Sequence, residues 1–78
     1  MNKFKKLMQN GLKIYYKYFL FGSMLEECSG ELCVDTETGK TEITKLAEWD
    51  YDKGNQILVH ALALKRNKFP DEYTFIYC

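Results

Sequence analysis

The spacing of lysines and apolar residues near the N-terminus is the feature that most restricts the fold of this chain. Placed at 100° per residue, one broad face of residues 3–21 collects Phe4, Leu7, Met8, Gly11, Leu12, Ile14, Tyr15, Tyr18 and Phe19. The opposite side carries Lys3, Lys6, Asn10, Lys13 and Lys17. This period of 3.6 residues predicts an amphipathic N-terminal helix over residues 3–21.

A break follows this predicted helix. Leu20 and Phe21 project toward the lysine side, so the helix either ends there or is buried all round. Gly22-Ser23 supplies the break, and the residues from Ser23 to Glu26 have the S-x-x-E form of a capping box. We therefore expect a short helical piece over residues 24–28, with one continuous helix through Gly22 as the alternative.

The middle of the chain predicts a β-hairpin over residues 31–45. Leu32 and Val34 alternate with charged or polar neighbours, which is the period of a half-buried strand. Thr38-Gly39 supplies the turn, because glycine readily takes a positive φ. The return strand, residues 41–45, is rich in β-branched side chains.

Residues 46–67 are ambiguous between strand and helix. Alanine and leucine favour a second helix at about residues 55–66, with Asp50 or Asp52 as the cap and Gly54 delaying the start. Residues 72–77 have the composition of a strand, which we place beside the hairpin. The expected fold is a single α+β domain, 1–78, in which a small three-stranded antiparallel sheet packs on helices.

The length of 78 residues excludes a Rossmann domain, a TIM barrel or a protein kinase. The charge-free run Tyr18–Leu25 is too short to span a membrane, and no cleavage site follows the basic N-terminus. We therefore expect an intracellular protein. The ratio of ten lysines to one arginine suits an AT-rich genome, so the expected compartment is a bacterial cytoplasm if a phage encodes the chain.

A net charge of zero hides an uneven distribution. Residues 1–25 carry five lysines and no acid, whereas residues 26–52 carry nine acids and two lysines. The predicted hairpin presents Glu31, Asp35, Glu37 and Glu42, which could mimic the phosphates of a nucleic acid or bind a basic groove. The alternative is that these charges only prevent pairing at the sheet edge.

Three other sets of residues offer alternative functions. Lys3, Lys6, Lys13 and Lys17, with Tyr16 nearby, could bind nucleic acid or an anionic membrane surface, although such rows are more often the wet face of a core helix. Cys28, Cys33, His60 and Cys78 could form a Cys₃His zinc site, but ordinary thiols are the commoner case, and we expect no metal and no cofactor. A cysteine with His60 could also make a small thiol enzyme.

The sequence shows no catalytic signature, so we expect a non-enzymatic module that binds another protein. Small size, twelve aromatic residues and the acidic segment are the features of inhibitors or adaptors from phages and mobile elements, of which anti-CRISPR proteins are an analogy. The expected partner is a protein with a basic groove. A homodimer with Phe21 near its interface is a further expectation.

Overall fold

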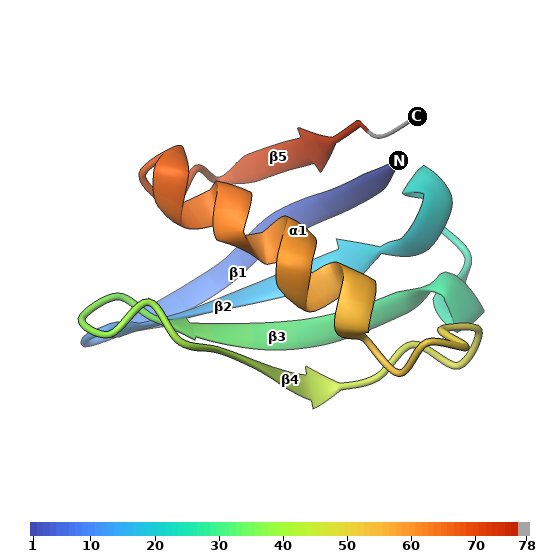
Figure 1. The fold of residues 1–78 in the computed structure, drawn as a ribbon, viewed down its shortest axis with the longest axis horizontal. Helices are drawn as coiled ribbons and strands as arrows, with labels where there is room; N and C mark the ends of the chain where they lie inside the picture. The colour runs from blue at the N-terminus through green and yellow to red at the C-terminus, as the bar shows by residue number, and fades with distance from the viewer. Residues whose placement is uncertain (77–78) are drawn as a thin grey trace.

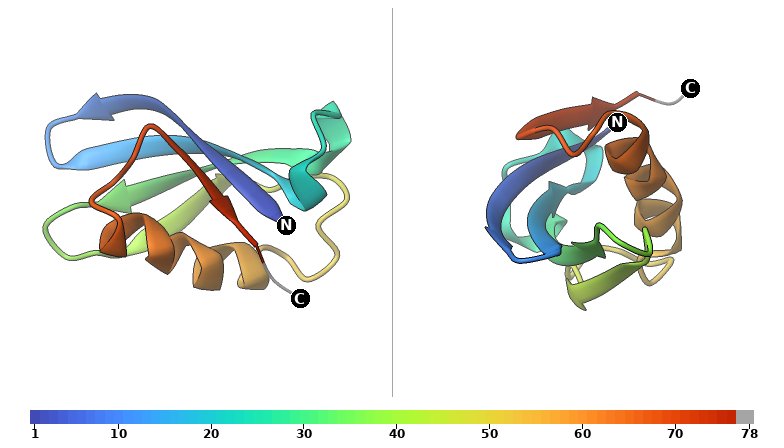
Figure 2. Two further views of the ribbon diagram at one scale, coloured as in Figure 1. Left: turned by 90° about the horizontal axis from the view of Figure 1, so that it is seen from above. Right: turned by 90° about the vertical axis from the view of Figure 1, so that its left-hand side faces the viewer.

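The computed structural model describes residues 1–76, and it forms a five-stranded antiparallel sheet in the order β4-β3-β2-β1-β5 (Figure 1). An α-helix, α1, lies across one face of this sheet and leaves the other face uncovered, as both views in Figure 2 show. The strands are β1 (Asn2–Asn10), β2 (Lys13–Phe19), β3 (Ser29–Asp35), β4 (Thr41–Lys45) and β5 (Glu72–Phe75). Helix α1 spans Asn55–Arg66, and two short 3₁₀ turns, η1 (Leu20–Gly22) and η2 (Glu26–Cys28), connect β2 to β3.

The predicted N-terminal helix is wrong, because residues 3–21 form the β1–β2 hairpin. The chain reverses through the two residues between Asn10 and Lys13, and Gly11 takes a φ of 61° there. The two loop residues are Gly11 and Leu12, and a glycine at the first position of a two-residue loop is a signal for a tight hairpin. β2 is also built from aromatic and β-branched side chains, which favour a strand.

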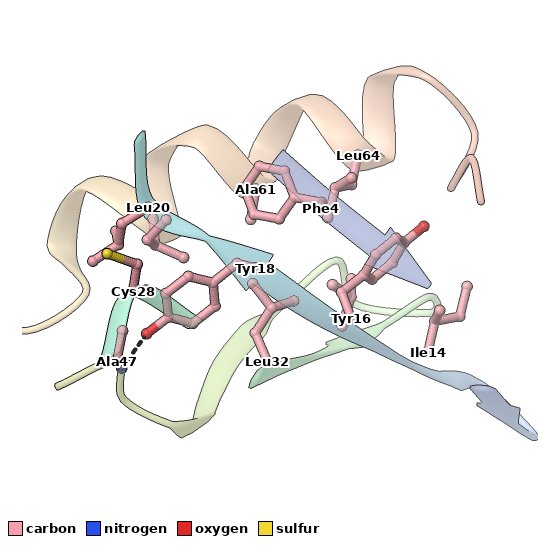
Figure 3. Close-up of a cluster of buried hydrophobic side chains, with 12 residues drawn as sticks. Phe4, Ile14, Tyr16, Tyr18, Leu20, Cys28, Leu32, Ala47, Ala61 and Leu64 are labelled. Carbon is pink, nitrogen blue, oxygen red and sulfur yellow. Dashed lines mark hydrogen bonds between the residues drawn. The ribbon is translucent and has the colours of Figure 1, made fainter. Parts of the chain in front are cut away.

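The buried face of the sheet follows the strand period of two. Phe4, Tyr16, Tyr18 and Leu32 are almost completely buried between the sheet and α1 (Figure 3). Met8 and Leu12, which the helical pattern also placed in the core, are exposed, and Phe19 is buried on the other face of the sheet.

Two buried tyrosines also fasten the sheet to neighbouring loops. The Tyr18 hydroxyl accepts a hydrogen bond from the backbone N–H of Ala47 at 2.7 Å (Figure 3). The Tyr16 hydroxyl donates to the carbonyl of Pro70 at 2.7 Å, and burial raises its pKa to about 12. Both rings therefore contribute apolar burial without leaving a polar atom unsatisfied.

The β3–β4 hairpin and the helix at residues 55–66 are present as predicted, with the turn at Gly39. The predicted capping box at Ser23–Glu26 does not form. The Ser23 hydroxyl accepts from the N–H of Leu25 at 3.2 Å, and the 3₁₀ turn begins only at Glu26.

The three-stranded sheet is also a wrong prediction, and so is the position of the C-terminal strand. β5 pairs with β1 and not with the β3–β4 hairpin. Once residues 2–19 form a hairpin, β1 becomes an open edge, and the crossover through α1 delivers β5 to it. Residue 77 of the predicted strand lies outside the described residues.

Helix α1 begins at a tight junction with the hairpin. Gly54 has a φ of 81°, and a Cβ added to it would overlap the Ile43 side chain. The Asp52 carboxylate accepts the N–H of Gln56 at 3.1 Å, which satisfies one free donor of the first helical turn. In the part of the chain that the structure describes, no helix has the length and apolar character needed to traverse a bilayer.

Candidate functional site: an open sheet face and an apolar end

The uncovered face of the sheet brings the predicted acidic site and the predicted lysine face together. Glu31 on β3 lies in register with Lys17 on β2 and with Lys45 on β4. Asp35 lies beside Lys13 in the same way. Two sets of residues that the sequence offered as rivals are therefore neighbours on one surface of mixed charge.

The four carboxylates of the β3–β4 hairpin differ in their hydrogen bonds and in their exposure. One oxygen of Asp35 accepts the N–H groups of Glu37 at 2.9 Å and Thr38 at 3.3 Å, so this carboxylate shapes the β3–β4 turn. Glu37 is exposed within that turn. Glu42 is exposed on edge strand β4, beside Cys33. Of these four, Glu31 and Glu42 lie on the uncovered face without a part in the turn, and Glu72 on β5, in register with Lys5, lies there too.

Three of the four predicted lysines share that face. Lys3, Lys13 and Lys17 lie on it, and Lys5 joins them. Lys6 is in register with buried Tyr16 on the helix side, and its ammonium pairs with Asp71 at 3.3 Å.

Two aromatic rings accompany these lysines. Half-buried Tyr15 is the aromatic side chain beside them, and Tyr16, which the sequence suggested, is buried in the core. The Lys17 ammonium sits 5.5 Å from the centre of the Phe19 ring, within range of a cation–π contact.

The proposed zinc ligands are not brought together. Cys28 is in the core, Cys33 lies on the uncovered sheet face, and His60 lies on α1 across the sheet. Cys78 lies outside the described residues. Among residues 1–76 no group of His, Cys, Asp or Glu side chains could hold a metal ion. The sheet also separates Cys33 from His60, so these two side chains do not form the thiol–imidazole pair of a thiol enzyme.

His60 instead belongs to a buried polar connection at the N-terminal end of β1. The Asn2 amide donates to Nδ1 of His60 at 2.9 Å, and the His60 ring stacks on Phe75 with centroids 4.0 Å apart. Burial, aided by the nearby N-terminal ammonium, lowers the pKa of His60 below its usual value, against the opposing charge of Asp52. The imidazole is therefore held neutral, with Nδ1 as an acceptor.

Phe21 is the predicted partner-binding residue with the most unusual environment. Its backbone has a φ of 58°, a left-handed conformation that costs a non-glycine residue about 1–2 kcal/mol. Its side chain is 66% exposed, so core packing does not offset that cost. The same Asn2 side chain that bonds His60 accepts the N–H of Phe21 at 3.2 Å.

Phe21 lies at one end of the molecule, where two loop segments expose several large apolar side chains. We call this region the apolar end: Met1 with residues 20–28 and 46–54, whose backbones lie at the end of the molecule opposite the hairpin turns in Figures 1 and 2. The N–H of Trp49 donates to the carbonyl of Glu27 at 3.0 Å and joins the two segments. Six of the thirteen exposed large apolar side chains of residues 1–76 belong to these segments: Phe21, Met24, Leu25, Leu46, Trp49 and Tyr51.

A pair of neighbouring carboxyl groups belongs to this end, Asp50 buried and Asp52 exposed. Asp50 is buried, and its Oδ2 has no hydrogen-bond partner in the described part of the chain when both groups are ionised. Burial first, and then the neighbouring Asp52, raise the pKa of Asp50. When Asp50 is protonated, its carboxyl group donates a hydrogen bond to the Asp52 carboxylate, and this bond lowers the pKa of Asp52. Asp52 therefore carries the outward negative charge of the pair.

Searches with protein-family models, curated proteins and solved structures gave no match to this chain. The function is therefore argued from the surface itself. Sequence patterning identified Phe21 but missed Asn2, Trp49 and the rest of the apolar end. Trp49 and Tyr51 alternate with acidic residues over positions 48–52, and this alternation is the signal that could have found it.

Proposed function

We propose that this chain is a protein-binding module, of the inhibitor or adaptor kind, and that Phe21 is a central contact for its partner. The observation that supports this most is the combination of backbone strain and exposure at Phe21. Strained backbone conformations persist where the surrounding structure enforces them, and they cluster at functional sites. Exposed aromatic side chains in apolar surroundings are the usual energetic centres of protein interfaces.

The acidic hairpin remains the second part of this proposal. Glu31 and Glu42 lie on the uncovered sheet face, and Glu37 is exposed in the adjoining turn. Exposed carboxylates of this kind mainly accelerate encounter with a basic partner. The anti-defence role and the bacterial cytoplasm stay predictions.

Phe21→Gly is the decisive substitution, because glycine adopts a positive φ without strain. We expect the melting temperature of this variant to equal or exceed that of the wild type, while its capture of the partner falls at least tenfold. Wild-type and variant baits are compared in host lysate by quantitative mass spectrometry. The matched control is Leu12→Ala, which truncates an exposed apolar side chain at the opposite end.

Two results would contradict the proposal. The first is a Phe21→Gly variant that captures the same proteins as wild type. The second is a clear loss of stability in Phe21→Gly, which would make Phe21 a structural residue.

A second function is favoured by one specific observation. The hairpin of β1 and β2 places Lys3, Lys5, Lys13 and Lys17 with Tyr15 on one uncovered face, an arrangement suited to the backbone and bases of single-stranded nucleic acid. Fluorescence anisotropy with a labelled oligonucleotide, and flotation with anionic vesicles, test this alternative. Binding that is lost in Lys5→Glu/Lys17→Glu and retained in Phe21→Gly would favour it over protein binding.

A further inference from the structure

The charges and apolar side chains of the apolar end indicate which side chains a binding partner must carry. Segments 20–28 and 46–54 carry five carboxylates and one lysine, interleaved with the exposed apolar side chains. One of the five, Asp50, is buried, and Glu26 pairs with Lys45 at 3.4 Å. Glu48 and Asp52 are exposed and adjoin Trp49 and Tyr51 in the sequence, and Glu27 is half-buried.

The apolar end is also held in position by the interior of the protein. The backbone of Ala47 bonds to the buried Tyr18 hydroxyl, and Trp49 bonds to Glu27. On the other segment, Asn2 holds the N–H of Phe21, and Asn2 itself bonds to His60 on α1. Both segments therefore carry fixed backbone anchors, which limits the ordering entropy lost on binding.

We infer that the apolar end binds a basic amphipathic segment of another protein, in which lysines or arginines flank a row of apolar side chains. This inference rests on the proposed function and adds the chemistry of the partner. Apolar side chains of the segment would cover Phe21 and Trp49, and its cations would face Glu48 and Asp52. A neutral apolar segment would leave those carboxylates unpaired at the rim, and a purely basic one would leave the apolar surface exposed to water.

Trp49 supplies a built-in reporter, because it is the single tryptophan of the chain and belongs to the surface in question. The probe is a synthetic 18-residue peptide of lysine and leucine whose leucines form one helical face. A second peptide of the same composition has its sequence scrambled so that no apolar face forms. Both peptides lack tryptophan, so a blue shift of the emission reports burial of Trp49 alone.

We expect the amphipathic peptide to shift the Trp49 emission and to bind at least tenfold more tightly than the scrambled peptide. Phe21→Gly should weaken this binding at least tenfold, whereas Leu12→Ala should leave it unchanged. Glu48→Gln should weaken binding at low salt and reduce its salt dependence, and Glu37→Gln at the distant hairpin turn should change neither.

Equal affinity for the two peptides, or equal effects of Phe21→Gly and Leu12→Ala, would overturn the inference. Concentration-dependent dimerisation that Phe21→Gly abolishes would also overturn it, because a second copy would then be the occupant. If the peptide fails while lysate capture still depends on Phe21, only the partner chemistry is wrong. If lysate capture is independent of Phe21, the proposed function itself is wrong.

Discussion

At the scale of single residues, His60 is a side chain whose protonation the fold opposes. Its Nδ1 accepts the Asn2 amide, its ring stacks on Phe75, and its pKa is lowered. The unfolded chain therefore takes up a proton below about pH 6.5, where the folded chain resists it. Stability should fall as the pH drops from the ordinary histidine value to the lower folded value, and should change no further below that.

This prediction is measured as the melting temperature between pH 5 and pH 8 for wild type and His60→Gln. The glutamine can still accept the Asn2 amide through its side-chain oxygen but does not titrate. We expect the wild type to lose more stability on acidification than the variant, even though Asp50 and Asp52 titrate in both. Parallel pH profiles would show that His60 protonates freely in the folded protein.

At the scale of elements, the secondary structure was predicted correctly where neighbouring residues alone determine it. The β3–β4 hairpin was predictable because its alternation, its turn glycine and its β-branched residues agree. Helix α1 was predictable from its alanines and leucines and from the capping side chain of Asp52. Residues 3–21 satisfy both a helical and a strand period, and the Gly11-Leu12 turn decides between them.

Pairing and surface properties were harder to predict, because they depend on distant parts of the chain. The neighbour of β5 is fixed only after β1 has become an open edge. Glu31 seemed part of an acidic surface until its neighbours in the sheet proved to be Lys17 and Lys45. The sequence pointed to Phe21 through an N-terminal helix that the structure does not contain. The exposure of Phe21 in the structure therefore supports its role in partner binding independently of that helix. The prediction of a homodimer loses the helix on which it rested.

Gly30 on β3 lies in register with Tyr18 on β2, and this close approach gives a prediction about β3. A Cβ added to Gly30 would overlap the Tyr18 ring and come within 2.5 Å of the Lys45 carbonyl oxygen. Gly30→Ala must therefore displace Tyr18, whose hydroxyl also holds Ala47. We expect a loss of about 3 kcal/mol of unfolding free energy, the upper end of the usual range for overpacking.

Urea denaturation of Gly30→Ala measures this loss. Gly11→Ala is the matched control, because no atom lies within 4 Å of the Cβ that it adds. Only the strain of a φ of 61° acts there, which costs about 1–2 kcal/mol. Equal losses in the two variants would mean that the Tyr18 ring moves aside without consequence.

At the scale of the whole molecule, the two ends of the chain meet in adjacent strands. β5 pairs with the first half of β1, from Asn2↔Phe75 to Lys5↔Glu72, and Phe75 stacks on the histidine of α1. A chain that ends at Pro70 would leave this edge of β1 unpaired. It would also remove Tyr73 and Phe75, which pack against the core beside Phe4.

A domain of only about 70 residues has little stability to spare, since such cores supply roughly 3–5 kcal/mol. We therefore expect the chain that ends at Pro70 to be largely unfolded at 25 °C by circular dichroism. Adding a synthetic peptide of residues 71–76 should restore part of the β signal, because the truncated protein still contains the β1 edge that receives it. A scrambled peptide should not. A truncated chain that melts like the full one would mean that the four strands and α1 fold without closure by the C-terminus, and that β5 is an addition to a domain already complete.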